Sequence, residues 1–291
     1  MDVQAISPSP FHFMYWLPAD VAIRMSQAGE RAPGRASSRR IPTASWRWAT
    51  SRCRRRRRAA AELEYCVKQL GFRGCEIGTN VAGARSRAGG ISSGRWRNDL
   101  DVVVFMHPNG FTQGDRLTDH YFTNVIGNPL DTTVALGHIV FDGLLERFAK
   151  LKLVAAHGGG YIAHYPARMD HVWGARVDAR TVLKKTPRQS LRRVYFDTIV
   201  FEREQLRHLV NLWGADHVLV GTDYPYDMGM YDPRGFVDGA KFLSAGDRAK
   251  IKGLNAAKLL EAEASGRGSA DPGYSRGARV DAVSGRKPCH G

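Results

Sequence analysis

The sequence predicts an α/β protein built on a parallel sheet, either open or closed into a barrel. From residue 98 to 262, short apolar runs flanked by Gly or Pro alternate with amphipathic stretches. Near-continuous apolar runs are typical of strands buried on both faces. Several runs end in a histidine or an aspartate. Because chemistry in such folds gathers at the carboxyl ends of the strands, these polar residues are candidate site residues.

The predicted elements follow one another along the chain. Strands are expected at Phe72–Ile77, Asp101–His107, Leu151–His157, Val194–Asp197 and His217–Asp223. Helices are expected at Ala60–Leu70, Ile139–Lys150, Glu202–Trp213 and Asp247–Leu260. In the third of these helices Leu206, Leu209 and Trp213 fall at helical spacing.

Composition narrows the class of protein. A chain of 291 residues with 43% hydrophobic residues can form one large domain with a sizeable core. We expect no membrane span and no secretory signal, because no run of about 18 apolar residues exists and no basic segment precedes an apolar one at the N-terminus. The four cysteines form no C-x-x-C pair. This pattern favours a cytoplasmic location over a disulfide scaffold.

The net charge of +15 comes from two segments. Residues 31–58 hold eleven arginines and residues 84–97 hold four, and neither segment has an acidic residue. Basic runs with aromatics can bind nucleic acid, and Arg52 to Arg58 with Trp46 and Trp48 form such a run. Because the rest of the chain carries no net charge, we disfavour a nucleic-acid partner.

The same two segments set the predicted domain boundaries. Residues 1–30 are expected to start the sheet, and 59–264 to form its remainder, with 84–97 irregular. Residues 31–58 are expected to be out of frame or disordered, because reading Ile41 to Arg54 two bases later with GC-rich codons gives a strand-like peptide. Our hypothesis is that both Arg-rich segments come from frameshifts. The Gly- and Ser-rich tail, 265–291, is expected to be disordered.

His107, His157 and Asp223 are the candidate ligands or bases. Each has a structural alternative: a satisfied core or loop histidine for His107, a tight turn for His157 with its three glycines, and a helix N-cap for Asp223. Two imidazoles and one carboxylate on separate strand ends are, together, a donor set that suits a divalent ion such as zinc. Such an ion polarises a carbonyl or activates water.

Five motifs in this order resemble the aminocarboxymuconate-semialdehyde decarboxylase branch of the amidohydrolase superfamily. They are Phe105-Met-His-Pro108, Ala156-His-Gly-Gly-Gly160, Tyr195-Phe-Asp197, Val220-Gly-Thr-Asp-Tyr-Pro225 and Asn255-Ala-Ala257. The resemblance covers about two-thirds of the chain and implies a (β/α)8 TIM-type barrel. It implies a metal-dependent, non-oxidative decarboxylase of an aromatic or dienoic carboxylic acid. A metal-dependent hydrolase is the alternative.

The resemblance also implies residue roles. His107 and Asp223 would be metal ligands, with zinc the expected metal, and His157 would be the catalytic acid/base. Arg168 matches an arginine that contacts the substrate carboxylate in a neighbouring subunit, which implies a homodimer; an ordinary ion pair of Arg168 with Asp170 or Asp178 is the alternative.

The chain departs from the family at its start. Family members begin with a strand that ends in a His-x-His pair of metal ligands, and no His-x-His occurs here. We therefore expect an incomplete barrel, with the first strand absent and the third strand scrambled in the Arg-rich segment. An inactive, degraded family member is a further alternative.

Overall fold

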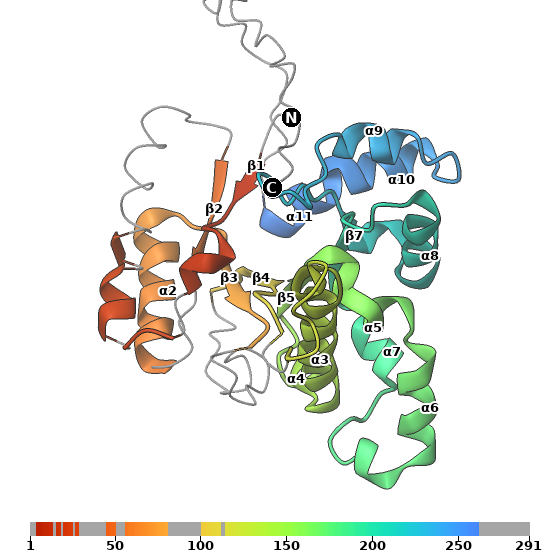
Figure 1. Ribbon diagram of the computed structural model, residues 1–291, viewed down its shortest axis with the longest axis horizontal. Helices are drawn as coiled ribbons and strands as arrows, with labels where there is room; N and C mark the ends of the chain where they lie inside the picture. The colour runs from red at the N-terminus through yellow and green to blue at the C-terminus, as the bar shows by residue number, and fades with distance from the viewer. Residues whose placement is uncertain are drawn as a thin grey trace, which may run out of the picture.

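Seven strands form one sheet, and all neighbouring strands run parallel, in the order β1 to β7 (Figure 1). The computed structural model describes residues 4–13, 16–18, 20–25, 27–28, 45–50, 56–80, 100–111 and 114–261. The strands are β1 (Gln4–Ile6), β2 (Ser45–Thr50), β3 (Gly74–Gly78), β4 (Val103–His107), β5 (Lys152–Ala155), β6 (Val194–Asp197) and β7 (Val218–Leu219). The predicted α/β class and parallel sheet are confirmed.

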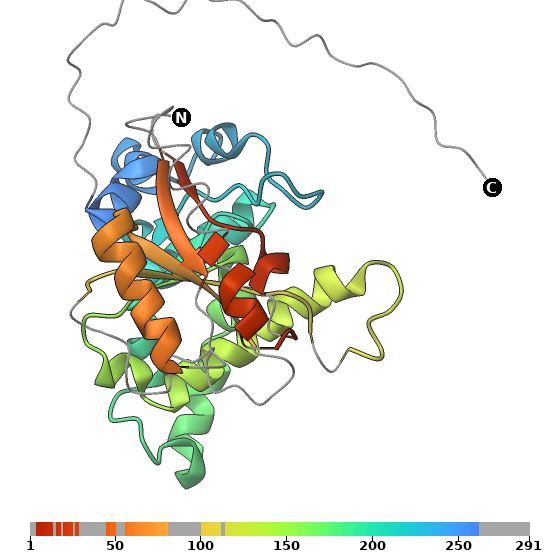
Figure 2. The same ribbon diagram turned by 90° about the vertical axis from the view of Figure 1, so that its left-hand side faces the viewer.

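Helices connect the strands and surround them (Figures 1 and 2). They are α2 (Arg56–Leu70), α3 (Asn128–Phe141), α4 (Leu144–Arg147), α5 (Gly160–His164), α6 (Ala167–Ala175), α7 (Pro187–Leu191), α8 (Arg203–Trp213), α9 (Pro233–Asp238), α10 (Ala245–Ala249) and α11 (Asn255–Leu260). Shorter 3₁₀ or π turns are η1 (Pro10–Phe13), η3 (Thr123–Gly127), η4 (His157–Gly159), η5 (Val177–Ala179), η6 (Ala215–His217) and η7 (Lys250–Leu254). This alternation is that of a (β/α)8-type barrel.

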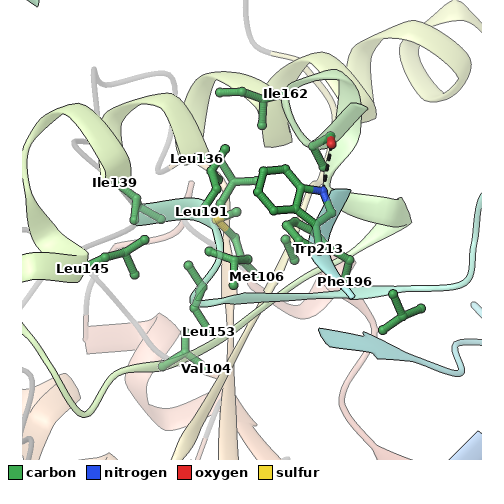
Figure 3. Close-up of a cluster of buried hydrophobic side chains, with 14 of the residues drawn as sticks. Val104, Met106, Leu136, Ile139, Leu145, Leu153, Ile162, Leu191, Phe196 and Trp213 are labelled. Atoms are coloured by element: carbon green, nitrogen blue, oxygen red, sulfur yellow. Dashed lines mark hydrogen bonds between the residues drawn. The ribbon is translucent and has the colours of Figure 1, made fainter. Parts of the chain in front are cut away.

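Strand residues on the helix side form the main core. Met106 and Phe196 lie there with Leu136 of α3, and all three are almost fully buried. The Trp213 indole N–H donates to the Ala163 carbonyl oxygen at 2.9 Å and so ties α8 to α5 (Figure 3). The alternate strand residues form a second, smaller cluster, with Val103 and Val154 packed against the end of α11. The two clusters are the two faces of a sheet buried on both sides.

The sheet has an open seam in the part of the chain that the structure describes. There β1 pairs with β2 alone, and β7 pairs with β6 alone. A closed (β/α)8 barrel has an eighth strand at this position. The expected absence of the first barrel strand stays a prediction.

A strand lies in the segment where the third strand is expected to be scrambled, and the frameshift origin of that segment stays a prediction. Ser45–Thr50 forms β2, which pairs in parallel with β1 and β3, for example through Trp48 opposite Gly74. The physical reason is local: the segment Ser-Trp-Arg-Trp-Ala-Thr alternates aromatic residues with others, which is a strand pattern that the arginine content hides. The start of α2, from Arg56, also lies in the segment expected to be disordered.

The other predicted boundaries either lie outside the described residues or differ from those in the structure. The rest of 31–58, all of 84–97 and the tail 265–291 lie outside the described residues. The helix predicted to begin at Ile139 begins at Asn128, where Pro129 occupies the first turn. In the described residues no helix is long and apolar enough to cross a membrane. The cytoplasmic location stays a prediction.

Candidate metal centre

Four ionisable side chains lie at the carboxyl ends of the strands β4 to β7. His107 is the last residue of β4, and Asp197 is the last residue of β6. His157 comes two residues after β5, and Asp223 comes four residues after β7. Because these four strands are parallel and consecutive in the sheet, their ends share one rim.

His107, His157 and Asp223 come together at this rim. One donor atom from each lies within 4.8 Å of those of the other two. The Nε2 atom of His107 is 3.6 Å from Asp223 Oδ1, and the Nε2 atom of His157 is 3.8 Å from Asp223 Oδ2. The two imidazole rings are 4.7 Å apart between centroids and nearly perpendicular. All three side chains are at most 15% exposed.

The ring of His107 is oriented by its own backbone neighbour. Its Nδ1 atom lies 2.6 Å from the Pro108 carbonyl oxygen. Because a carbonyl oxygen only accepts, Nδ1 donates this bond, and the opposite ring nitrogen, Nε2, faces Asp223. Metal-binding histidines are typically held in this way, with the far ring nitrogen bonded to a carbonyl or carboxylate.

The electrostatics of the centre keep the Asp223 carboxylate ionised. Burial favours its neutral form, but the nearby imidazoles of His107 and His157 outweigh burial and hold the pKa of Asp223 well below its usual range. Burial acts to lower the pKa of His157, yet the Asp223 and Asp197 carboxylates outweigh it and raise that pKa. The centre therefore combines a charged carboxylate with two imidazoles, a donor set that fits a divalent ion.

The turn that carries His157 depends on the glycines behind it. His157 and the three following glycines all have positive φ, between 55° and 79°. A Cβ atom on Gly159 would lie only 2.5 Å from the Phe196 ring and 2.8 Å from the Ala163 Cβ. Gly158 to Gly160 therefore allow the turn that presents His157 at the rim, as predicted, and replacing them would strain the backbone.

Asp197 holds this turn from the neighbouring strand. Its carboxylate accepts N–H bonds from His157 at 2.9 Å, from Gly158 at 2.9 Å and from Ile199 at 3.0 Å. Burial raises the pKa of Asp197, while His157 and the three N–H groups act against that rise. The sequence analysis includes Asp197 in a motif and assigns it no role. Its position at the end of an apolar strand was the signal that could have identified it.

Glu76 is a second carboxylate that sequence reasoning did not single out. It lies in β3 and is 1% exposed, and its atom Oε2 is buried with no hydrogen-bond partner in the part of the chain that the structure describes. The nearby Asp131 of α3 is equally buried but paired: it accepts from the Thr79 hydroxyl, and from Asn80 Nδ2 at 2.7 Å. Of these two carboxylates, Glu76 is the one with a buried unpaired oxygen in the described residues.

The loop after β1 contacts the loops that follow β4 and β7. The hydroxyl of Ser9, just after β1, is hydrogen bonded to the phenol of Tyr226, just after Asp223. The Phe11 ring packs edge-on against Tyr226, with 6.1 Å between centroids. Asn109, two residues after His107, donates to the Pro10 carbonyl oxygen at 3.2 Å. These contacts place aromatic surface near the three donors.

Arg168 does not join the other site residues within this chain. It lies on α6 with an exposed side chain, and it makes no ion pair among the described residues. The two carboxylates considered as its alternative partners bind other arginines: Asp170 pairs with Arg188 and Asp178 with Arg176. The ion-pair alternative is therefore wrong, and a role in a neighbouring subunit stays a prediction.

The fold and the centre together define a class of protein, a metal-dependent (β/α)8-barrel enzyme. The amidohydrolase family profile matches residues 2–262. The chain therefore belongs to the amidohydrolase family. This finding confirms the resemblance seen in the motifs.

Curated relatives narrow the branch of the family. The chain is 29% identical over 274 residues to the 2-amino-3-carboxymuconate-6-semialdehyde decarboxylase of Dictyostelium discoideum, a match that covers 89% of this chain and 73% of that protein. It is 33% identical over 165 residues to the Caenorhabditis elegans enzyme of the same name, covering 56% and 41%. The chain thus spans less than half of the second relative.

Solved structures share the fold. The 5-carboxyvanillate decarboxylase LigW of Sphingomonas paucimobilis superposes with a TM-score of 0.80 at 22% identity, over 89% of this chain and 79% of that one. The Novosphingobium aromaticivorans enzyme of the same name, which holds manganese, superposes with a TM-score of 0.81 at 19% identity, over 90% and 76%. At these identities the likeness supports the barrel fold alone.

Proposed function

We propose that this protein is a metal-dependent, non-oxidative decarboxylase of an aromatic or dienoic carboxylic acid. The observation that carries the proposal is the group of His107, His157 and Asp223, with donor atoms within 4.8 Å of one another at the strand ends. The decarboxylases among the relatives support the reaction class.

The surroundings of each residue indicate its role. His107 and Asp223 would hold the divalent ion, because the Nε2 atom of His107 faces a carboxylate whose pKa lies well below its usual range. A bound ion would supply positive charge that orients and polarises the substrate oxygens. His157 stands on the glycine turn with a raised pKa, so it holds a proton more firmly than an ordinary histidine. We assign it as the general acid.

The proton balance follows from that assignment. As the bond between the substrate carbon and its carboxylate breaks, the electron pair stays on the carbon and carbon dioxide leaves. The proton of His157 Nε2 forms the new C–H bond, and the neutral imidazole then regains a proton from solvent. Tyr226 and Phe11 offer aromatic surface to a planar substrate.

The finer assignments belong to the same proposal. Zinc suits a mixed imidazole and carboxylate donor set, and manganese, which the Novosphingobium enzyme holds, is the competing ion. Arg168 would contact the substrate carboxylate in a neighbouring subunit of a homodimer; its free, exposed guanidinium supports that role.

Metal analysis and a carbon dioxide release assay on the purified full chain test the proposal. The substrates are those named for the relatives: 2-amino-3-carboxymuconate-6-semialdehyde and 5-carboxyvanillate. We expect one divalent ion per chain and turnover of one acid. His107→Ala should lose both, while His157→Asn should keep the ion and lose turnover. Absence of bound metal, or metal without release of carbon dioxide, contradicts the proposal; ester or amide hydrolysis in place of decarboxylation would favour a hydrolase.

A mixing experiment tests Arg168 separately. If Arg168 acts in the neighbouring subunit, Arg168→Ala and His157→Asn chains that are each inactive should regain partial activity when unfolded and refolded together. A pair that stays inactive, or a chain that sediments as a monomer, contradicts the homodimer assignment.

A further inference from the structure

Glu76 lies directly beneath the candidate metal centre, on the inner face of the barrel. In the β3–β4 register, Gly78 is opposite His107 and Glu76 is opposite Phe105. Opposed residues of parallel strands point to the same side, and side chains alternate along each strand. Phe105 and Val154 belong to the inner apolar cluster. Glu76 therefore points to the inside, one side-chain layer below His107.

This position is unusual for a carboxylate. The layer of Glu76 continues through Phe105 to Val154 and Tyr195, which are opposite one another in the strand registers. The Ser7 hydroxyl bonds to Glu76, but Oε2 has no partner in the described residues. Burial, set against the charge of His107, raises the pKa of Glu76 to about 7. A buried carboxylate is retained at such a place when a positive charge compensates it.

The charges that face Glu76 are those of the metal centre itself. His107 attracts its negative form, and Asp223 repels it. Glu76 and Asp223 thus bring two carboxylates to the same side of the sheet as His107, a group that suits a divalent ion. Glu76 is absent from the group of donors that lie within 4.8 Å of one another, so it lies outside direct coordination.

We propose that Glu76 is the second carboxylate of the metal centre, which strengthens divalent-ion binding from the layer below without being a ligand. The inference rests on the proposed metal site, and it concerns metal affinity rather than turnover. On this proposal, the unpaired Oε2 atom of Glu76 interacts with the ion when the ion is bound, either through space or through a bridging water.

Competition with a chromophoric chelator on the chelator-stripped full chain measures this effect, with Zn²⁺ and Mn²⁺ as separate probes at pH 8. Glu76→Gln keeps the volume and removes the charge, and we expect its dissociation constant to rise about 10- to 100-fold, the usual effect of changing a partner of the ligands. Asp131→Asn is the matched control, because it removes an equally buried carboxylate that is already paired. Its affinity should stay within about twofold of that of the unchanged protein.

The melting temperature of the metal-free proteins separates this role from a purely structural one. Glu76→Gln removes an uncompensated buried charge, so the metal-free variant should melt at the same or a higher temperature than the unchanged protein. An affinity within about twofold of that of the unchanged protein overturns the inference. So does weaker binding accompanied by a drop in melting temperature as large as that of Asp131→Asn. If the unchanged chain itself binds neither ion, the proposed metal site fails, and this inference fails with it.

Discussion

Replacement of Asp197 by asparagine should disable the enzyme while leaving the metal centre loaded. The carboxylate accepts three backbone N–H bonds, at 2.9, 2.9 and 3.0 Å, and two of these come from the turn of His157 and Gly158. An asparagine oxygen can replace Oδ1, which binds Gly158 and Ile199. Its NH₂ group then faces the His157 N–H, so one bond is lost and two donors are opposed.

The size of the effect follows from the one broken contact. A hydrogen bond to a charged group contributes about 1.5–3 kcal/mol, and a buried N–H left unpaired has a penalty of similar size. If roughly 2–3 kcal/mol of that change falls on the active arrangement of His157, kcat should drop about 30- to 150-fold. KM should change little, because neither His107 nor Asp223 contacts Asp197 directly. Metal content should stay at the level of the unchanged protein.

Steady-state kinetics and metal analysis on the same preparation test this reasoning. Asp131→Asn again serves as the control, with the same change of charge at a buried carboxylate that bonds to Thr79 and Asn80, just after β3. A kcat for Asp197→Asn within threefold of the control would refute the positioning role. So would a loss of bound metal in parallel with the loss of turnover, since the defect would then lie in the ligands.

Three further changes probe the scaffold. Gly159→Ala should lower the free energy of unfolding, measured by urea titration, by roughly 2–5 kcal/mol, and it should reduce kcat. The reason is that φ of Gly159 is +79° and the new Cβ atom would lie 2.5 Å from Phe196. Gly253→Ala is the control and should be neutral in the same titration, because the space around Gly253 is open. Trp213→Phe should cost about 1–3 kcal/mol in that titration by leaving the Ala163 oxygen unpaired, with metal affinity unchanged. Burial and His208 lower the pKa of His164, so the unfolded chain binds a proton first as the pH falls; stability should decline below about pH 6.5, and less so in His164→Gln, as pH-dependent melting would show.

The sequence predicts the strand ends of this protein well, because each apolar run stops at a residue that the fold exposes to the site. β6 has the predicted bounds, and His107, His157 and Asp223 meet as expected. Asp197, the polar end of β6, is in a quoted motif, but the sequence analysis assigns it no role. Glu76 is not a predicted site residue because it lies within a strand among glycine, cysteine and isoleucine. Its inward orientation follows from the strand register.

Other errors have the same local origin. β2 lies in the Arg-rich segment, where the arginine content hides the alternation of a strand. The start of α3 was placed eleven residues late because its first turns carry few apolar residues, and Pro129 there marks a helix start as readily as a break. The role of Arg168 depends on a second chain, which a single sequence does not describe.

The location of the donors explains how a metal centre can form in a sheet with an open seam. The three donors lie at the carboxyl ends of β4, β5 and β7, and Asp197 at the end of β6 holds the turn that carries His157. These four strands are consecutive, and their outer faces share one continuous buried core with α3, α5 and α8. The relative positions of His107, His157 and Asp223 are therefore set by strand pairing and packing on the side of the sheet away from β1. In the proposed metal centre, the buried carboxylate of Glu76 would add a second negative charge beside Asp223.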